Sequence, residues 1–311
     1  MKLEMKLQHL LMVMAALGAA ACDEGASPLD AGDAPGADAS SPTDASAGRD
    51  GGGSPDADAG QPAPDAAVDA GAEPVDAGTD AGPEPAPRNT LEVLTGETST
   101  GYSDGVGADA RFNGAWGVLH PDGSTLYVVE TFNQTLRRVD LATREVTTIA
   151  GAVQESAVVD GTGAEARFAS PRAPAITPDG SAIYLADSGT IRRVELPSAS
   201  VTTVAGRWDE FGFVDGTGAD ARIGGLIQDL ELSADGSTLY IADRSNTTLR
   251  ALDIATATLT TLAGAPYERG PGDPWQHADG VGVEVRMGPT GGIAQVDDAV
   301  FFADTFNHCI R

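Results

Sequence analysis

Long apolar runs recur at intervals along the second half of the chain. Four of them end in a single acidic residue: LYVVE at 126–130, IYLAD at 183–187, LYIAD at 239–243 and VFFAD at 300–304. Runs of this length, with β-branched and aromatic members, are typical of strands that are covered on both faces. The segments after them, such as TLRRVDL at 135–141 and TLRALDI at 248–254, alternate apolar and polar residues and predict a second strand with one wetter face.

Each apolar run belongs to a larger unit of four short strands without a helix. A first strand is expected at 116–120, 174–177, 229–233 and 293–296. In the first three units a Pro-Asp-Gly-Ser or Ala-Asp-Gly-Ser segment then predicts a tight turn into the apolar run. The unit closes with VTTIAG, VTTVAG or LTTLAG, ending at Gly151, Gly206 and Gly264, and this segment predicts the outer strand.

The units recur with a nearly fixed period. DGVG or DGTG segments open at Asp104, Asp160, Asp215 and Asp279, at steps of 56, 55 and 64 residues. A period of this size marks an array of supersecondary units, none of which buries its apolar face alone. Four-stranded antiparallel units repeated in this way predict an all-β fold, a β-propeller.

The third strand carries a more specific signature. The last unit contains ADTFNHCIR at 303–311, with Asn307-His308 followed by Cys309 and Ile310, and the first contains ETFNQTLRRVDL at 130–141. These segments resemble NHL repeats, which are named for an Asn-His-Leu signature. The resemblance covers residues 89–311, and it implies a propeller, commonly six-bladed, that serves as a binding platform.

The last of the four units is incomplete, because the sequence stops at Arg311, inside its third strand. Two arrangements are open. Asn89–Gly96 aligns on VTTIAG and could supply the outer strand of the last blade, which would remove a free edge. The alternative, which we favour, is that the sequence is a fragment lacking about two blades.

The N-terminal part predicts export followed by a spacer. Residues 1–22 carry Lys2 and Lys6, an apolar run at 10–17, and small residues before Cys22, as in a signal peptide. The end of this segment resembles the lipobox of bacterial lipoproteins, which implies that Cys22 is lipidated; cleavage by ordinary signal peptidase after 19–21 is the alternative. Residues 23–88, rich in Asp, Ala, Gly and Pro, predict a disordered acidic linker.

Charge narrows the range of partners. The formal net charge of the 311 residues is −27. Residues 23–88 hold 15 acidic residues against two arginines, and the repeat region is acidic as well. A nucleic-acid partner is therefore not expected, and contact with a membrane is expected through the lipid anchor only. Two cysteines make no disulfide framework.

The DGxG segments are predicted to be structural. Gly105-Val106-Gly107 and the residues after it mimic a dinucleotide-binding fingerprint, but the segment is repeated and a strand follows it in place of a helix. The four Asp residues suit turns that cap the loops between blades. Each has an arginine seven residues later that could pair with it or with a neighbouring blade: Arg111, Arg167, Arg222 and Arg286. Calcium binding is the alternative, although one DGxG loop supplies few carboxylates.

An enzymatic alternative rests on three scattered residues. Some propeller lactonases and lyases bind a metal through acids or histidines at the central channel, and the candidates here are Asp229, Glu231 and His120. They occupy non-equivalent positions in different blades, and the chain has no HExxH or GxSxG motif. We therefore expect no metal, no cofactor and no enzymatic activity.

Aromatic residues in the loops between blades are the candidate ligand-binding residues. These loops connect the outer strand of one blade to the next blade, and in a propeller they gather on one face, where aromatic side chains are plausible contact anchors. Capping of the blades is the alternative role. The hypothesis is a binding or scaffolding module of the cell envelope whose partner is an unidentified protein or glycan. The candidate residues are Tyr102, Trp208, Phe211, Phe213, Tyr267 and Trp275.

Overall fold

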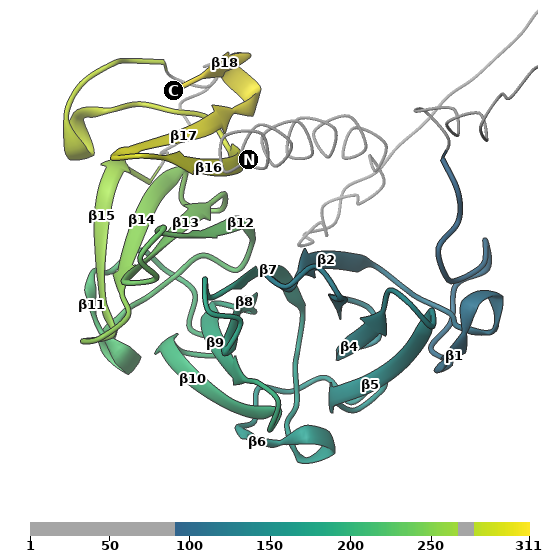
Figure 1. The fold of residues 1–311 in the computed structure, drawn as a ribbon. Helices are drawn as coiled ribbons and strands as arrows, with labels where there is room; N and C mark the ends of the chain where they lie inside the picture. The colour runs from purple at the N-terminus through teal and green to yellow at the C-terminus, as the bar shows by residue number, and fades with distance from the viewer. Residues whose placement is uncertain (1–90, 267–276) are drawn as a thin grey trace, which may run out of the picture. The chain divides into compact units, whose positions relative to one another are not determined.

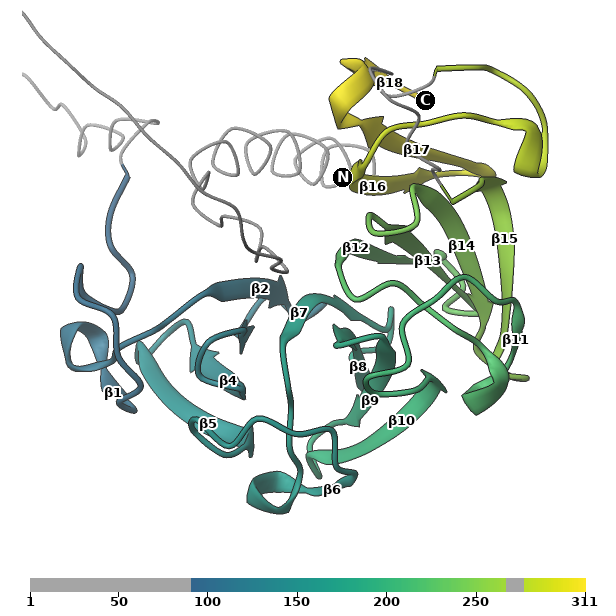
Figure 2. The ribbon, with the colours of Figure 1, turned by 180° about the vertical axis from the view of Figure 1, so that it is seen from behind.

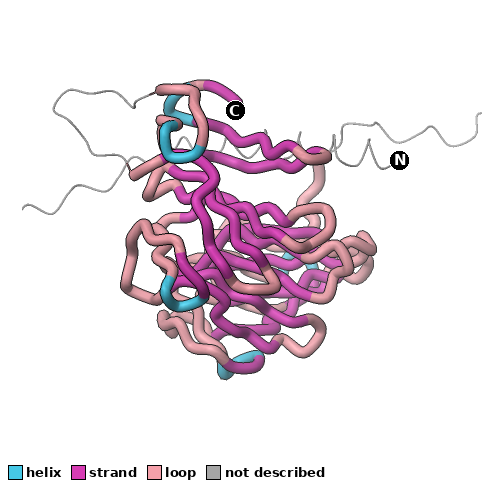
Figure 3. The backbone as a smooth tube through the Cα atoms, turned by 90° about the vertical axis from the view of Figure 1, so that its left-hand side faces the viewer, coloured by secondary structure: helices cyan, strands magenta, loops and turns pink. Residues whose placement is uncertain are grey.

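The computed structural model describes residues 91–266 and 277–311. These residues form four antiparallel sheets in a propeller arrangement, joined by loops and short 3-10 turns (Figures 1 and 3). The all-β propeller predicted from the repeat is confirmed. The predicted signal peptide with Cys22 and the predicted linker lie outside the described residues. Within the described ranges, no helix has the length and apolarity needed to cross a membrane.

Each blade is built from consecutive hairpins, with neighbouring strands in sequence order. The innermost strands are β2 (Ala115–Leu119), β7 (Pro171–Ile176), β12 (Ile227–Leu232) and β16 (Thr290–Val296). The apolar runs form the second strands, β3 (Thr125–Glu130), β8 (Ala182–Asp187), β13 (Thr238–Asp243) and β17 (Ala299–Asp304). The third strands are β4 (Thr135–Asp140), β9 (Thr190–Glu195), β14 (Thr248–Asp253) and the short β18 (Cys309–Ile310), and the fourth are β5 (Glu145–Gly151), β10 (Ser200–Gly206) and β15 (Thr258–Gly264).

The first three blades carry a fifth strand that the sequence pattern does not reveal. The DGxG segments form β1 (Gly105–Val106), β6 (Gly161–Thr162) and β11 (Gly216–Thr217), which pair with the fourth strands β5, β10 and β15. A 3-10 turn follows each of them, at Gly107–Asp109, Gly163–Glu165 and Gly218–Asp220. The connection between two blades therefore runs along the outer edge of the next blade before it reaches the innermost strand, and the fourth strand is not the edge of the sheet.

The hydrophobic core lies between the blades. The first strands of consecutive blades are neighbours, β2 beside β7, β7 beside β12 and β12 beside β16 (Figures 1 and 2). Buried side chains from both blades fill each interface: Leu136 with Phe168 and Ile183 between the first two, and Ile191 with Leu239 between the second and third. Because every blade buries its faces against the next, no blade is expected to fold alone.

The predicted Asp-Gly turns join the first and second strands. Asp122 accepts hydrogen bonds from the backbone N–H and the hydroxyl of Ser124, both at 2.8 Å, and Gly123 follows with φ +75°. The same contacts recur at Asp179 and Asp235. Asp179 and Asp235 also accept a hydrogen bond from the hydroxyl of Thr177 and of Ser233, each at 2.6 Å. The contacts from Thr177 and Ser233, followed by those from the serines of the turns, favour the charged carboxylate, and the pKa of all three aspartates is lowered to about 2.

The proposed closing strand at the N-terminal edge is not formed in the described residues. Residues 91–96 contain no strand, and the Gly96 N–H donates to the carbonyl of Gly107 in the first blade at 2.9 Å. The sheet of the fourth unit has the order β16-β17-β18. The alignment of Asn89–Gly96 on VTTIAG was misleading, because its described end, at Gly96, bonds to the first blade and not to the fourth unit.

Candidate ligand-binding face

The antiparallel order of the strands places two kinds of loop at the same end of the blades. The turns between the second and third strands, at 131–134, 188–189, 244–247 and 305–308, lie at the end where the first strands begin. The connections that leave the fourth strands start at this end too, at 152–160 and 207–215, and residues 97–104 occupy the equivalent place in the first blade. We call this end the loop face.

A repeated buried ion pair supports the loop face from below. Arg137, Arg192 and Arg250, on the third strands, are almost fully buried. In the second blade Arg192 Nη1 lies 3.0 Å from Asp187 Oδ2, and neither side chain is exposed. Burial raises the pKa of the Asp187 carboxyl, and the Ser170 N–H and Arg192 oppose that shift. Each guanidinium also lies over an aromatic ring, those of Phe112, Phe168 and Phe213.

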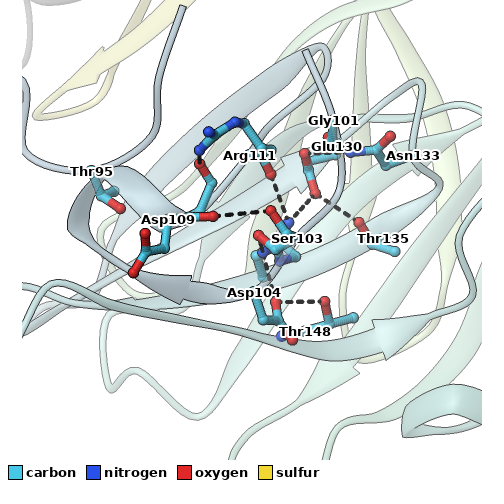
Figure 4. A network of polar contacts seen from close by, with 12 residues as sticks. Thr95, Gly101, Ser103, Asp104, Asp109, Arg111, Glu130, Asn133, Thr135 and Thr148 are labelled. Atoms are coloured by element: carbon cyan, nitrogen blue, oxygen red, sulfur yellow. Dashed lines mark hydrogen bonds and ion pairs between the residues drawn. The ribbon is translucent and has the colours of Figure 1, made fainter. Parts of the chain in front are cut away.

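The same arginines hold the DGxG segments in place. Asp104 lies 2.6 Å from Arg137 Nη2 and accepts hydrogen bonds from the backbone N–H and hydroxyl of Thr148, both at 3.0 Å (Figure 4). Asp160, Asp215 and Asp279 make equivalent ion pairs with Arg192, Arg250 and Arg311. The structural role predicted for these aspartates is therefore supported, but their partner is an arginine of the third strand of the same blade.

The arginine seven residues after each aspartate has other partners. Arg111, Arg167 and Arg222 pair with Glu97, Glu155 and Glu210 in the loops, and each donates to carbonyls of the neighbouring 3-10 turn. Arg286 donates to the carbonyls of Val283 and Val285. The seven-residue spacing suggested a pair within the segment, whereas the short fifth strand turns the two side chains toward different neighbours.

The asparagine of the repeat signature ties the loop face to the buried acid. Asn133 Nδ2 donates to Glu130 at 2.8 Å and to the carbonyl of Gly101 at 2.7 Å (Figure 4). Asn246 makes the same two contacts, with Asp243 and with Gly212, each at 2.7 Å. The loops that carry Tyr102 and Phe211 are thereby fixed to the sheet, which is the kind of support that a rigid binding surface needs.

The predicted ligand-binding residues fall into three groups. Tyr102, Trp208 and Phe211 are 57%, 49% and 54% exposed on the loop face. The ring of Phe211 lies against Gly189 and Gly225, where an added Cβ would come within 2.8 and 3.2 Å of it. Phe213 is half-buried under the Arg250 guanidinium, so its contact is internal. Tyr267 and Trp275 lie outside the described residues, and ligand binding by the whole set stays a prediction.

Two exposed aromatics of the loop face were not predicted. Phe132 and Phe306 sit in the turns between the second and third strands and are 63% and 44% exposed. Both belong to the Thr-Phe-Asn segment that was assigned to the repeat signature alone. Their shared position in the repeat, next to a turn, is the signal that could have found them.

The structure does not unite the three candidates of the enzymatic alternative. His120 lies in a turn at the opposite end of the blades, 2.9 Å from Asp122. Asp229 bridges two blades, because its carboxylate accepts the backbone N–H of Ile293 on β16 at 2.8 Å. Within the described ranges, no group of three or more His, Cys, Asp or Glu side chains could hold a metal ion.

Asp229 is expected to make the stability of the propeller pH-dependent. Burial raises its pKa from 3.8 to about 6. Between these values the folded state binds more protons than the unfolded state, so this contribution to stability is present at about pH 4 and is lost as the pH rises through 6. Relative to the wild type, Asp229→Asn should gain on the order of 3 kcal/mol in unfolding free energy from pH 4 to 7, measured by urea denaturation.

Asp235→Asn is the matched control for this measurement. The pKa of Asp235 is lowered to about 2, so its contribution is complete above its ordinary pKa of 3.8 and is lost only as the pH falls below that value. The difference between this variant and the wild type should stay constant from pH 4 to 7. If the difference in unfolding free energy between Asp229→Asn and the wild type also stayed constant from pH 4 to 7, the raised pKa of Asp229 would be contradicted.

Comparisons with known proteins point to the same repeat. No family model matches the chain. It is 28% identical over 218 residues to SUPPRESSOR OF QUENCHING 1 of Arabidopsis thaliana, covering 68% of this chain and 21% of that protein. It is 26% and 24% identical to NHL repeat-containing protein 2 of Bos taurus and Homo sapiens, covering 71% of this chain and 34% of each. The chain therefore spans a fifth to a third of these relatives.

Solved structures match part of the chain. An auxiliary nutrient binding protein from Bacteroides thetaiotaomicron matches 62% of this chain and 45% of its own, with 22% identity and a TM-score of 0.48. A protein of the same description from Bacteroides ovatus matches 70% of this chain and 75% of its own, with 17% identity and a TM-score of 0.36.

Proposed function

We propose that the chain is a non-enzymatic binding module, an NHL-type propeller that captures a protein or glycan on its loop face. The observation that carries the proposal is the gathering of exposed aromatic side chains there, on loops that are fixed to the sheets by buried asparagine and arginine contacts. Aromatic side chains supply large contact area at low entropic cost, and in a polar surface they are enriched at binding sites.

The proposal extends to the location of the module. The signal-like residues 1–22, with the lipobox-like end at Cys22, support export and a lipid anchor in the cell envelope, and the acidic segment 23–88 would serve as a flexible stalk. The intact mass of the mature protein from its native host tests the anchor, because lipid on Cys22 adds mass that ordinary signal cleavage does not.

Loss of the exposed aromatic side chains should weaken binding without affecting the fold. We expect Tyr102→Ser and Trp208→Ser to weaken capture of a ligand from a panel of purified glycans and envelope proteins by about tenfold each. Both side chains are about half exposed, so the melting temperature should stay within a degree or two of the wild type.

Leu262→Ser is the matched control, because Leu262 is an exposed apolar residue on the fourth strand β15 and not in the loops of the loop face. It should leave the affinity unchanged. Equal affinities for the wild type and both aromatic variants would remove Tyr102 and Trp208 from the proposed surface.

A further inference from the structure

Among the described residues, two arginines near the loop face, Arg172 and Arg244, form no ion pair, whereas most of the other described arginines do. The chain has 46 Asp and Glu against 19 Lys and Arg, so acidic partners are abundant. Among the described residues, however, neither Arg172 nor Arg244 forms an ion pair with a carboxylate, whereas Arg138, Arg193 and the buried arginines do. Within the described ranges, these two cations of the loop face therefore have no carboxylate partner.

Only some of the hydrogen-bond donors of the Arg172 side chain have a partner. Its Nη2 donates to the hydroxyl of Ser170 at 2.9 Å, while its Nε is buried without a hydrogen-bond partner. Burial lowers the pKa of Arg172; the charge of Asp187 opposes this shift, and the charge of Arg244 adds to it. Asp187 is already engaged by Arg192 and by two backbone N–H groups. Gln228, the residue of β12 equivalent to Arg172 of the neighbouring β7, accepts a hydrogen bond from Arg244. This contact brings Arg244 to the strand beside Arg172, in agreement with the effect of its charge.

Arg244 is held from two sides. Its Nη1 donates to Gln228 Oε1 at 3.0 Å, and its guanidinium carbon lies 5.8 Å from the centre of the Phe306 ring. These contacts use one N–H group and one face of the guanidinium, so other donors of its fork stay available to a ligand. Gln228 thus orients Arg244 as Ser170 orients Arg172.

Local backbone geometry directs these side chains. Arg172 and Gln228 are each the second residue of an innermost strand, β7 and β12, and the register of both strands shifts there. Ala173, next to Arg172, has φ +48°, which is unusual for a residue with a side chain. Bulges of this kind re-aim side chains, and they are common beside functional sites.

The repeat itself shows that the fold does not require arginine at either position. The residue equivalent to Arg172 is Trp116 in the first blade and Gly291 in the fourth. The place of Arg244, directly after the buried acid, is taken by Thr131, Ser188 and Thr305 in the other blades. Thr131 donates to the carbonyl of Pro171 and needs no charge. Both arginines are therefore departures from the structural repeat.

We propose that Arg172 and Arg244 form a binding site for the oxyanion of a small organic molecule, a carboxylate or a phosphate. This inference goes beyond the proposed function, because its ligand is a small anionic molecule and not a protein or a neutral glycan. An oxyanion between the two guanidiniums would accept charge-assisted hydrogen bonds from both and would cancel their repulsion. The exposed ring of Phe306, beside Arg244, would contact the apolar part of the same molecule.

Calorimetric titration of the full chain with three probes tests the proposal. Glucuronate carries a carboxylate, glucose 6-phosphate carries a phosphate, and glucose is their neutral counterpart. We expect at least one of the two anions to bind with a Kd of about 1 mM or tighter, and glucose not to bind. Which anion binds better distinguishes the two sources of the oxyanion. Arg172→Gln and Arg244→Gln should each weaken that binding by about tenfold or more.

Arg144→Gln is the matched control. Arg144 forms no ion pair with the other described residues, and it lies in the turn between β4 and β5 at the opposite end of the blades. It should leave anion binding unchanged. The melting temperatures without ligand give a second readout: because each glutamine relieves repulsion, the two site variants should melt at or above the wild-type temperature at low salt.

The proposed site would be contradicted if neither anion bound at about 10 mM, or if the wild type and both site variants bound the anion equally well. Marked destabilisation by both variants would also contradict it, because it would indicate a structural role for the two arginines. The proposed function is tested separately: it would survive any of these results if Tyr102→Ser and Trp208→Ser still weakened capture of a neutral glycan or a protein.

Discussion

Arg192→Met is expected to lower the free energy of unfolding by about 3–5 kcal/mol. The variant leaves the Asp187 carboxylate buried without its cation, because both side chains are fully buried and lie 3.0 Å apart. It also removes donors to the carbonyls of Arg167 and Val159. Urea denaturation of the wild type and the variant at pH 7 measures the difference.

The neighbouring arginine supplies the control. Arg193 lies on the same strand, but its side chain is 35% exposed and pairs with Glu195 at the surface. Arg193→Met should cost less than about 1 kcal/mol. The double variant Arg192→Met with Asp187→Asn should recover part of the loss, since it removes the stranded charge. Equal costs for the two single variants would show that burial of the pair is not what stabilises the blade.

Gly151→Ala is expected to lower the free energy of unfolding by more than about 3 kcal/mol. Gly151 ends β5 with φ +88°, and an added Cβ would lie 2.3 Å from the carbonyl oxygen of Gln134 and 2.9 Å from the Phe168 ring. The alanine would therefore strain its own backbone and also push apart the third and fourth strands at the edge of a blade interface. Thermal and urea unfolding measure the loss.

Gly123→Ala separates the two causes. Gly123 has a similar φ of +75°, but nothing lies within 4 Å of the position of its Cβ. This variant should show only the backbone cost of a left-handed conformation, about 1–2 kcal/mol. If both variants lost the same unfolding free energy, the close contact at Gly151 would not contribute to the cost of the substitution.

These two predictions concern the same feature, the locking of each blade at its loop-face end. The buried arginine joins the acid of the second strand to the aspartate of the DGxG segment, and that aspartate holds the threonine of the fourth strand. Gly151, three residues after this threonine, allows the third and fourth strands to pack closely together. A rigid end of this kind suits a surface that binds without rearranging.

The sequence by itself determined the local elements and their repetition. The apolar runs ending at Glu130, Asp187 and Asp243, and the Asp-Gly turns before them, are patterns of neighbouring residues. Alternation, burial and turn chemistry act over a few positions, so they predict strands and hairpins wherever they occur. The fixed period then predicted blades that pack on one another.

Only the tertiary structure decided which residues of different segments meet. Asp104 and Arg137 are far apart in sequence, and their pairing depends on a two-residue strand too short to carry a hydrophobic pattern. Arg244 and Arg172 come from different blades, and Arg244 reaches the innermost strand beside β7 through its hydrogen bond to Gln228. Contacts across loops depend on backbone direction and on how one sheet is turned against the next, and no local pattern encodes that geometry.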